Sequence, residues 1–273
     1  LAFDRATGCL CRYAMQDREQ LTRPLQHCFM RARTDNDYMI DNPGSYYEQW
    51  CEAGLDRLRT AVRAFTAAQT ADNEAVVRVH TRHAPAPDAA GVAVHTCYTV
   101  TGDGRVRVEN TVVVDDDLPV LPRIGMHAGV VPALEHAAWY GRGPHESYCD
   151  RKRSALVGVY HAAVDDLFFP FIDPCECGGH EDTRWLRLTP ADGPGGLVIT
   201  GEPTVHFAAL HYTVDDLIQA GHVYELNRTD DIQLHIDGFH MGLGGDTGWT
   251  RNVHAEYLLP PGTYRYGFTL GPA

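Results

Sequence analysis

The sequence lacks the features of a membrane or nucleic-acid protein. None of its 273 residues falls in an uninterrupted apolar run of about 18, the length that a membrane-spanning helix needs. The first residues, LAFDRATGCLCRY, have neither the basic start nor the apolar core of a secretion signal. Positive charge is scarce, because 23 Lys and Arg stand against 36 Asp and Glu and give a formal net charge of −13. Such a surface repels phosphate backbones and anionic lipids, so we expect neither nucleic acid nor a membrane as a partner.

The eight cysteines do not form the dense framework of a small disulfide-stapled domain. Two close pairs occur, Cys9 with Cys11 and Cys175 with Cys177. We expect mainly reduced thiols in a cytoplasmic protein. The second pair belongs to DPCECGGHEDTRW, whose C-x-C spacing and single histidine do not match a closed zinc site. We therefore predict a surface loop there and no metal bound by this chain.

Alternation of apolar and polar residues dominates the rest of the chain. In RVRVENTVVV, Val106, Val108 and Val114 fall on one face of an extended strand and the charged residues on the other. The segments AVVRVHTRH, GVAVHTCYTV, RWLRL, GLVIT, VHFAAL, IQLHID and TYRYGFTL repeat this pattern, and TGDGR at 101–105 predicts a hairpin turn. Similar strands flank the Pro/Ala-rich segment 83–91, which indicates a loop inside one domain. We predict an all-β fold, a large antiparallel sandwich forming a single domain over residues 1–273.

Two short helices are expected among the strands. SYYEQWCEAG places Ser45 and Glu48 in the positions of a capping box and ends at Gly54, which can take the left-handed conformation. TVDDLIQAG repeats this arrangement from Thr213 to a closing Gly221. Each helix would cover about two turns and lie across a sheet edge or a loop.

The glycine-rich segment 238–249, GFHMGLGGDTGW, is the first candidate site. It is not a phosphate cradle, because it lacks the G-x-G-x-x-G spacing and the following residues 250–259 are strand-like and not helical. Its Gly242, Gly244, Gly245 and Asp246 would let the backbone bend sharply and approach a ligand. Trp249 could present its flat face to a sugar ring or could be a buried core residue, and the residues alone leave both interpretations open.

A second candidate is WYGRGPHESYCDRK, residues 139–152, where Gly-Arg-Gly-Pro predicts a turn. Arg142 and Arg151 are expected to form ion pairs with carboxylates such as Asp150 or Glu146. No H-E-x-x-H, G-x-S-x-G or nucleophilic-cysteine signature occurs, and no pair of carboxylates stands out as that of a glycosidase.

Several segments in a fixed order carry a family resemblance: FDRATGCL, PLQHCFMRARTDND, PRIG, WYGRGPHESYCDRK, YHAAVDDLFFPFIDP and IDGFHMGLGGDTGW. Together they resemble the C-terminal, small-chain domain of the large bacterial β-galactosidases, which are family-two glycoside hydrolases. The resemblance covers nearly the whole chain. It implies a β-supersandwich, a fold related to galactose mutarotases.

The resemblance also implies a division of labour within a longer, multidomain enzyme that hydrolyses terminal non-reducing β-D-galactosides such as lactose with retention. The catalytic glutamates and the magnesium and sodium sites would lie mainly on a TIM barrel and its neighbours, absent from this chain, so the chain contains no catalytic residue and should be inactive alone. Trp249 would stack on the galactoside at the mouth of the active site, supported by the glycine loop. A homo-oligomer is expected only for the full-length protein.

The chain departs from the family pattern at two places. The segment 38–45, YMIDNPGS, follows DND where the family has a mobile loop, and it is shorter than that loop. Residues 175–178 read Cys-Glu-Cys-Gly where the family often has Ser-Glu-Asn-Gly.

Two other functions remain as alternatives. The first is a free-standing carbohydrate-binding domain, which an exposed apolar docking surface would argue against. The second is an aldose mutarotase, which needs a carboxylate base and a histidine acid on one concave face. Its nearest candidates in the sequence are Glu202, His206, His211 and Asp237.

Overall fold

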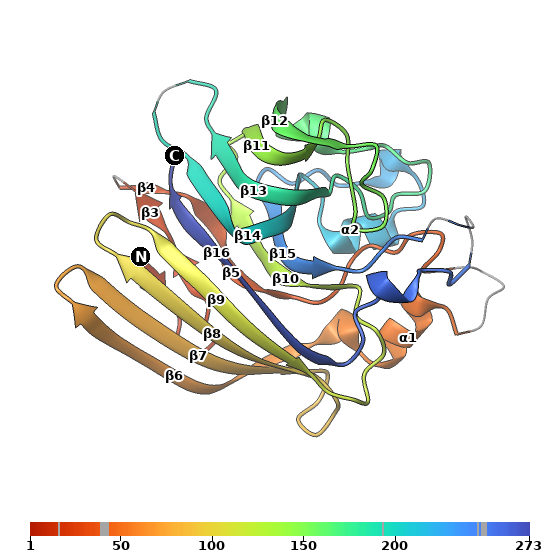
Figure 1. Cartoon of the computed structure of the whole chain (residues 1–273), viewed down its shortest axis with the longest axis horizontal. Coiled ribbons are helices and arrows are strands. Elements are labelled where there is room, and N and C mark those ends of the chain that lie inside the picture. Colours follow the sequence, from red (N-terminus) through yellow and green to blue (C-terminus); the bar gives the residue numbers. More distant parts are fainter. Residues whose placement is uncertain (16, 39–43, 193, 245, 247–249) are drawn as a thin grey trace.

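The computed structural model describes residues 1–15, 17–38, 44–192, 194–244, 246 and 250–273 (Figure 1). Antiparallel strands dominate it, as the alternation predicts. The strands are β1 (Ala2–Phe3), β2 (Leu10–Arg12), β3 (Ala14–Met15), β4 (Arg18–Glu19), β5 (Leu21–Cys28), β6 (Arg59–Ala71), β7 (Glu74–Ala84), β8 (Val92–Thr101), β9 (Val106–Val114), β10 (Arg123–Val130), β11 (His136–Gly143), β12 (Leu156–Ala163), β13 (His180–Thr189), β14 (Leu197–Leu210), β15 (Ile232–His240) and β16 (Gly262–Pro272).

Fourteen of these strands form one sheet that folds back on itself (Figure 1). Its order is β1-β2-β5-β10-β15-β14-β16-β9-β8-β7-β6, and β13, β11 and β12 continue from the other edge of β14. Side chains of β5, β10 and β15 pack against those of β7, β8 and β9 in a shared core that includes Leu25, Met126 and Tyr98. The predicted antiparallel sandwich is confirmed.

The long strand β14 explains how the sheet turns. Its first half, Leu197 to Glu202, pairs with β16, and its second half, His206 to Leu210, pairs with β15. The segments GLVIT and VHFAAL, which alternation predicts as separate strands, are therefore one strand with two partners. This change of partner joins the two layers of the sandwich.

Local predictions for the β6–β9 region are confirmed. In β9, Val106, Val108 and Val114 are buried and Arg107 and Val113 are exposed. The hairpin between β8 and β9 closes with the Thr101 amide donating to the Arg105 carbonyl at 2.9 Å. The Pro/Ala-rich segment is the loop between β7 and β8.

The two short helices are α1 (Tyr46–Glu52) and α2 (Val214–Gln219). In α1 the capping box of Ser45 and Glu48 is present, and Gly54 adopts φ +77° as expected. In α2, Thr213 accepts a hydrogen bond from the Asp216 amide, but the helix ends at Ala220 in an extended conformation. The prediction that Gly221 closes this helix in the left-handed conformation is wrong, because its φ is not positive. Its amide donates to the Glu225 carboxylate at 2.8 Å.

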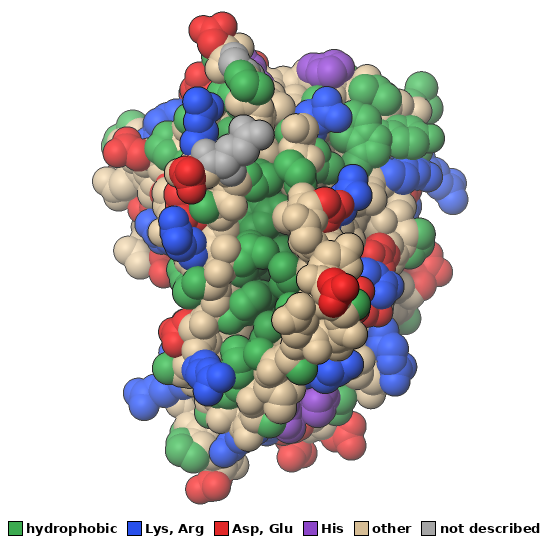
Figure 2. Space-filling view, turned by 90° about the vertical axis from the view of Figure 1, so that its left-hand side faces the viewer, with side chains coloured by type: hydrophobic (Ala, Val, Ile, Leu, Met, Phe, Trp, Pro, Cys, Tyr) green, Lys and Arg blue, Asp and Glu red, His purple; other side chains and the backbone are tan. Residues whose placement is uncertain are grey.

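One end of the sandwich is open between the layers. Figure 2 shows apolar side chains in the groove at this end. A cavity of about 670 Å³ there is lined by Met15, Leu134 and Pro272 among others. No helix in the described part of the chain is long and apolar enough to cross a membrane.

Candidate functional site

Strand β15 leads directly into the glycine-rich segment, and Arg31 holds the beginning of that segment. The Arg31 guanidinium donates to the Met241 carbonyl at 2.7 Å and to the Gly242 carbonyl at 3.1 Å. It also forms a 2.7 Å ion pair with Asp37, and both side chains are 0% exposed. A planar guanidinium can serve a carboxylate and two carbonyls together because its donors are arranged as a fork. The RARTDND and glycine-rich motifs therefore meet in space.

Two further side chains bind the described residues of the glycine loop. The Asp150 carboxylate accepts from the Gly244 amide at 2.8 Å, and Asn36 donates to the Leu243 carbonyl at 2.9 Å and accepts from the Thr250 amide at 3.3 Å. A Cβ atom at position 242 would lie 2.5 Å from the Asp150 carboxylate, so only glycine permits this approach.

Of the predicted loop residues, Gly242 and Gly244 lie at this anchored base, and Gly244 has φ +84°. Asp246 is exposed and pairs with His254 at 2.7 Å. Gly245 and Trp249 lie outside the described residues. The expectation of a strand over 250–259 is wrong, because a 3₁₀ turn over Ala255–Tyr257 occupies part of that segment.

Behind the loop, Arg123 of the PRIG motif organises a buried polar cluster. It donates to Asp237 at 3.1 Å and to Glu176 at 3.3 Å, and its Nη1 lies 3.0 Å from His235 Nδ1. Burial by itself raises the pKa of Glu176, but the combined effect of Arg123, His240 and Arg31 outweighs burial and lowers that pKa to about 2. Glu176 is therefore an ionised partner that neutralises Arg123 in the interior.

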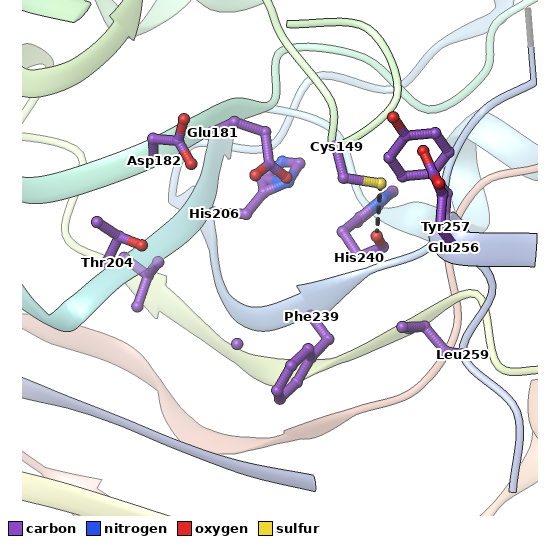
Figure 3. A pocket seen from close by; sticks show the side chains of 12 residues that line it. Cys149, Glu181, Asp182, Thr204, His206, Phe239, His240, Glu256, Tyr257 and Leu259 are labelled. Carbon is purple, nitrogen blue, oxygen red and sulfur yellow. Dashed lines mark hydrogen bonds and ion pairs between the residues drawn. The ribbon is translucent and has the colours of Figure 1, made fainter.

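A cavity of about 210 Å³ opens beside this cluster (Figure 3). Glu181 at the start of β13 and His206 in β14 face each other in its wall, with Glu181 Oε1 3.2 Å from His206 Nδ1. On another side, the Cys149 thiol donates to the His240 carbonyl at 3.2 Å. Phe239 and Leu259 form its apolar side. Polar groups thus gather on one wall and apolar groups on the opposite one.

The Glu181–His206 pair has perturbed acidities. Burial raises the pKa of Glu181 to about 7, and burial with the neighbouring His240 and Arg123 lowers the pKa of His206 well below its usual value. A carboxyl group that titrates near neutral pH beside a neutral imidazole can bind a hydroxyl group and exchange a proton with it. The sequence contains Glu181 among several acidic residues, and nothing in the spacing marks it, since His206 lies 25 positions away.

The two motifs around this cavity differ from their predictions. Gly141, Arg142 and Gly143 end strand β11 and do not form the predicted turn. Arg151 pairs with Glu146 as expected, whereas Arg142 pairs with Asp182 at 2.5 Å. The DPCECGG segment is not the predicted surface loop, because Glu176 and Cys177 within it and His180 after it are buried. Glu176 can be buried because its carboxylate forms an ion pair with Arg123.

The cysteines of the chain are present as thiols. All eight cysteines are free, and Cys175 and Cys177 are not paired with each other. Within the described ranges, no group of three or more His, Cys, Asp or Glu residues could hold a metal ion.

The four mutarotase candidates do not come together on one surface. Glu202 pairs with Arg107 at 2.8 Å on the exterior, and His211 bonds to the Thr229 carbonyl at 3.1 Å. His206 and Asp237 are neighbours on β14 and β15, but Asp237 is engaged by Arg123. The arrangement that the structure does create, Glu181 with His206, includes only one of the four.

Comparison with known proteins identifies the family. The model of the family described as beta galactosidase small chain matches residues 1–270. A β-galactosidase from Vibrio cholerae serotype O1 is 37% identical over 98% of this chain, and one from Priestia megaterium is 32% identical over 99%. The chain spans about a quarter of the length of these relatives, 26% and 25% respectively.

Among solved structures, a galactose 1-epimerase from Lactobacillus acidophilus NCFM matches over 98% of this chain and 89% of its own. Its TM-score is 0.48 at 9% identity, a likeness too low to carry an inference. The sequence matches identify the family without the structural likeness, because the family model matches almost every residue. The chain belongs to the beta-galactosidase small-chain family.

Proposed function

We propose that this chain is the C-terminal part of a cytoplasmic β-galactosidase that hydrolyses terminal non-reducing β-D-galactosides such as lactose with retention of configuration. The observation that carries the proposal is the 37% identity to the Vibrio cholerae β-galactosidase over 98% of this chain but only 26% of that relative. The catalytic glutamates, the TIM barrel and the magnesium and sodium sites would lie in the remainder of the longer protein. The isolated chain would then not cleave the substrate.

In this proposal Trp249 stacks on the galactoside at the mouth of the active site. The contacts around the glycine loop support a positioning role, because Arg31 and Asp150 bind its beginning and Asn36 binds Thr250 beyond it. Such anchors restrict the ends of a loop whose glycines permit close approach to a ligand. An indole face offers about 1 kcal/mol of stacking beyond simple burial.

An exposed apolar strip favours a module of a larger protein over a free-standing binding domain. In β12, Val159 and Val157 are 55% and 41% exposed on one face, together with Tyr140, which is paired in register with Val159 and is 38% exposed. Leu156, which is 71% exposed, projects from the other face of the same strand. Among the described strands, β12 pairs only with β11 and leaves its other edge open. Apolar edge strands favour association, so another domain or another subunit of the longer protein would cover this one.

The first experiment measures hydrolysis of nitrophenyl β-galactoside by the 273-residue chain and by the longer protein encoded by the complete gene. We expect no turnover by the chain alone and turnover by the longer protein, with the β-anomer of galactose as first product by NMR. Turnover by the chain alone would place catalytic residues within this sequence and refute the proposed division of labour.

The second experiment tests Trp249→Ala in the longer protein, with Trp185→Ala as the matched control. Trp185 is a half-buried residue of β13, outside the glycine loop. Losing about 1 kcal/mol of stacking should raise KM about fivefold for Trp249→Ala and change kcat less. Equal effects of the two substitutions on KM would assign Trp249 a structural role only.

A further inference from the structure

Another cavity lies on the side of the central strands that α2 covers. Its volume is about 410 Å³, and it is bounded by β5, β10, β15, the start of α2 and the segment 55–60. The residues that line it are distinct from those of the glycine loop and of the Glu181–His206 cavity. It is therefore a separate candidate site.

One wall of this cavity is a row of polar side chains across three strands. Gln26 of β5 is paired in register with His127 of β10, which is paired in register with His235 of β15. Directly opposed residues of antiparallel neighbours project from the same face, so the three side chains stand side by side. The rings of His127 and His235 lie 4.7 Å apart.

The cavity presents little net positive charge. Burial lowers the pKa of both His127 and His235, and for His235 the nearby Arg123 adds to this effect, so both imidazoles are neutral. The one lining arginine, Arg23, pairs with Asp231 at 3.1 Å. Two carboxylates also line the cavity: Asp215 adds negative charge, and Asp56 pairs with Arg57 at 2.8 Å. An anion would be repelled, and a neutral ligand suits the site.

Several hydrogen-bonding groups of the lining have no partner in the described part of the chain. Arg123 can only donate, so His235 accepts through Nδ1 and carries its proton on Nε2, which bonds to no described residue. The Gln26 carboxamide and the Asp215 carboxylate likewise make no hydrogen bond with a described residue. The hydrogen-bond donors are the His235 Nε2–H and the Gln26 NH₂ group, and the acceptors are the Gln26 carbonyl oxygen and the Asp215 carboxylate.

Apolar side chains also line the cavity, among them Phe29, Leu55 and Ile218. A pyranose has the matching character, because its hydroxyl groups need donors and acceptors while its C–H face packs on apolar carbon. His235 is buried whereas Gln26 and Asp215 are exposed to solvent, so an apolar ligand seated here would cover their donors and acceptors without pairing them, which is costly.

We propose that this cavity binds a neutral polyol, specifically a monosaccharide ring. Binding here is independent of the proposed role of Trp249 and of hydrolysis. The site would give the chain a sugar-binding surface separate from the mouth of the active site.

The test is saturation-transfer NMR and calorimetric titration of the 273-residue chain with D-galactose and with D-glucose. The site variants are Gln26→Leu and Asp215→Ala, and their matched controls are Gln219→Leu on α2 and Asp166→Ala, both exposed and outside this cavity. Trp249→Ala separates this site from the glycine loop. We expect saturable binding with a dissociation constant of about 1–10 mM, weakened about fivefold by Gln26→Leu and about tenfold by Asp215→Ala.

Unchanged affinity in the two controls completes the expected result, and saturable binding that remains in Trp249→Ala assigns the sugar to this cavity. Absence of saturable binding for both sugars, or loss of binding in Trp249→Ala with full affinity in Gln26→Leu, overturns the proposal. Because all these measurements are of binding to the chain alone, a negative outcome leaves the proposed hydrolytic function standing, and failure of that function leaves this site standing.

Discussion

Substituting Arg31 by methionine should destabilise the fold strongly. Methionine keeps an unbranched stem against Trp50, over whose ring the guanidinium carbon lies at 5.5 Å. It removes the hydrogen bonds to Asp37, to the Met241 carbonyl and to the Gly242 carbonyl. Asp37, which is fully buried, then retains the hydrogen bond from the Thr34 amide at 3.0 Å.

The size of the effect follows from the burial of both partners. Removing one partner of a buried ion pair leaves an uncompensated charge and costs about 3–5 kcal/mol. That is a large fraction of the roughly 5–15 kcal/mol that stabilises a typical protein. An exposed pair behaves differently, since breaking one costs less than about 1 kcal/mol. Glu202→Gln, which breaks the pair with Arg107, is such a control, with side chains 31% and 49% exposed.

Urea unfolding of four proteins measures the difference: wild type, Arg31→Met, Glu202→Gln and the double variant Arg31→Met/Asp37→Leu. The double variant should be more stable than Arg31→Met, because it removes the stranded carboxylate together with its partner. Two results would refute this account. Either Arg31→Met is no more destabilising than Glu202→Gln, or the double variant is the least stable of the four. In both cases the buried Arg31–Asp37 pair does not stabilise the start of the glycine loop.

Two further predictions concern close packing and acidity. Gly238→Ala would place a Cβ 2.2 Å from the Tyr266 ring, so we expect a loss of about 1–3 kcal/mol in urea unfolding, and a loss below about 0.5 kcal/mol would contradict the packing. Glu181 has its pKa raised from 4.5 to about 7, so the folded state holds this proton more tightly than the unfolded state. Its contribution to the free energy of unfolding is full below pH 4.5 and is lost as pH rises through about 7, on the order of 3 kcal/mol. Glu181→Gln should abolish that decline between about pH 5 and pH 8, and identical pH profiles of variant and wild type would refute the assignment.

The fold was largely predictable because its signals are local. Alternation with a period of two places Val106 and Val108 in the core whatever their partners are, and a capping box needs only Ser45 and Glu48. The predictions that failed depended on context. Gly221 does not take the left-handed conformation, and its amide donates to the Glu225 carboxylate. Arg142 forms an ion pair as predicted, but its partner is Asp182, 40 residues away in the sequence.

The family, and with it the expectation for Trp249, also came from sequence, since the order of several segments identifies it without any contact between them. The sequence did not show which residues come together in the candidate sites. Arg31 reaches a carbonyl 210 residues further along the chain, and Glu181 meets His206 only because β13 and β14 are neighbours in the sheet. The three side chains of the proposed sugar cavity likewise come from β5, β10 and β15. The sequence by itself determined which segments become strands, because the alternation of apolar and polar neighbours decides which face of a strand each side chain occupies. Only the tertiary structure decided which charges are buried together, because strand order and register bring distant residues into contact.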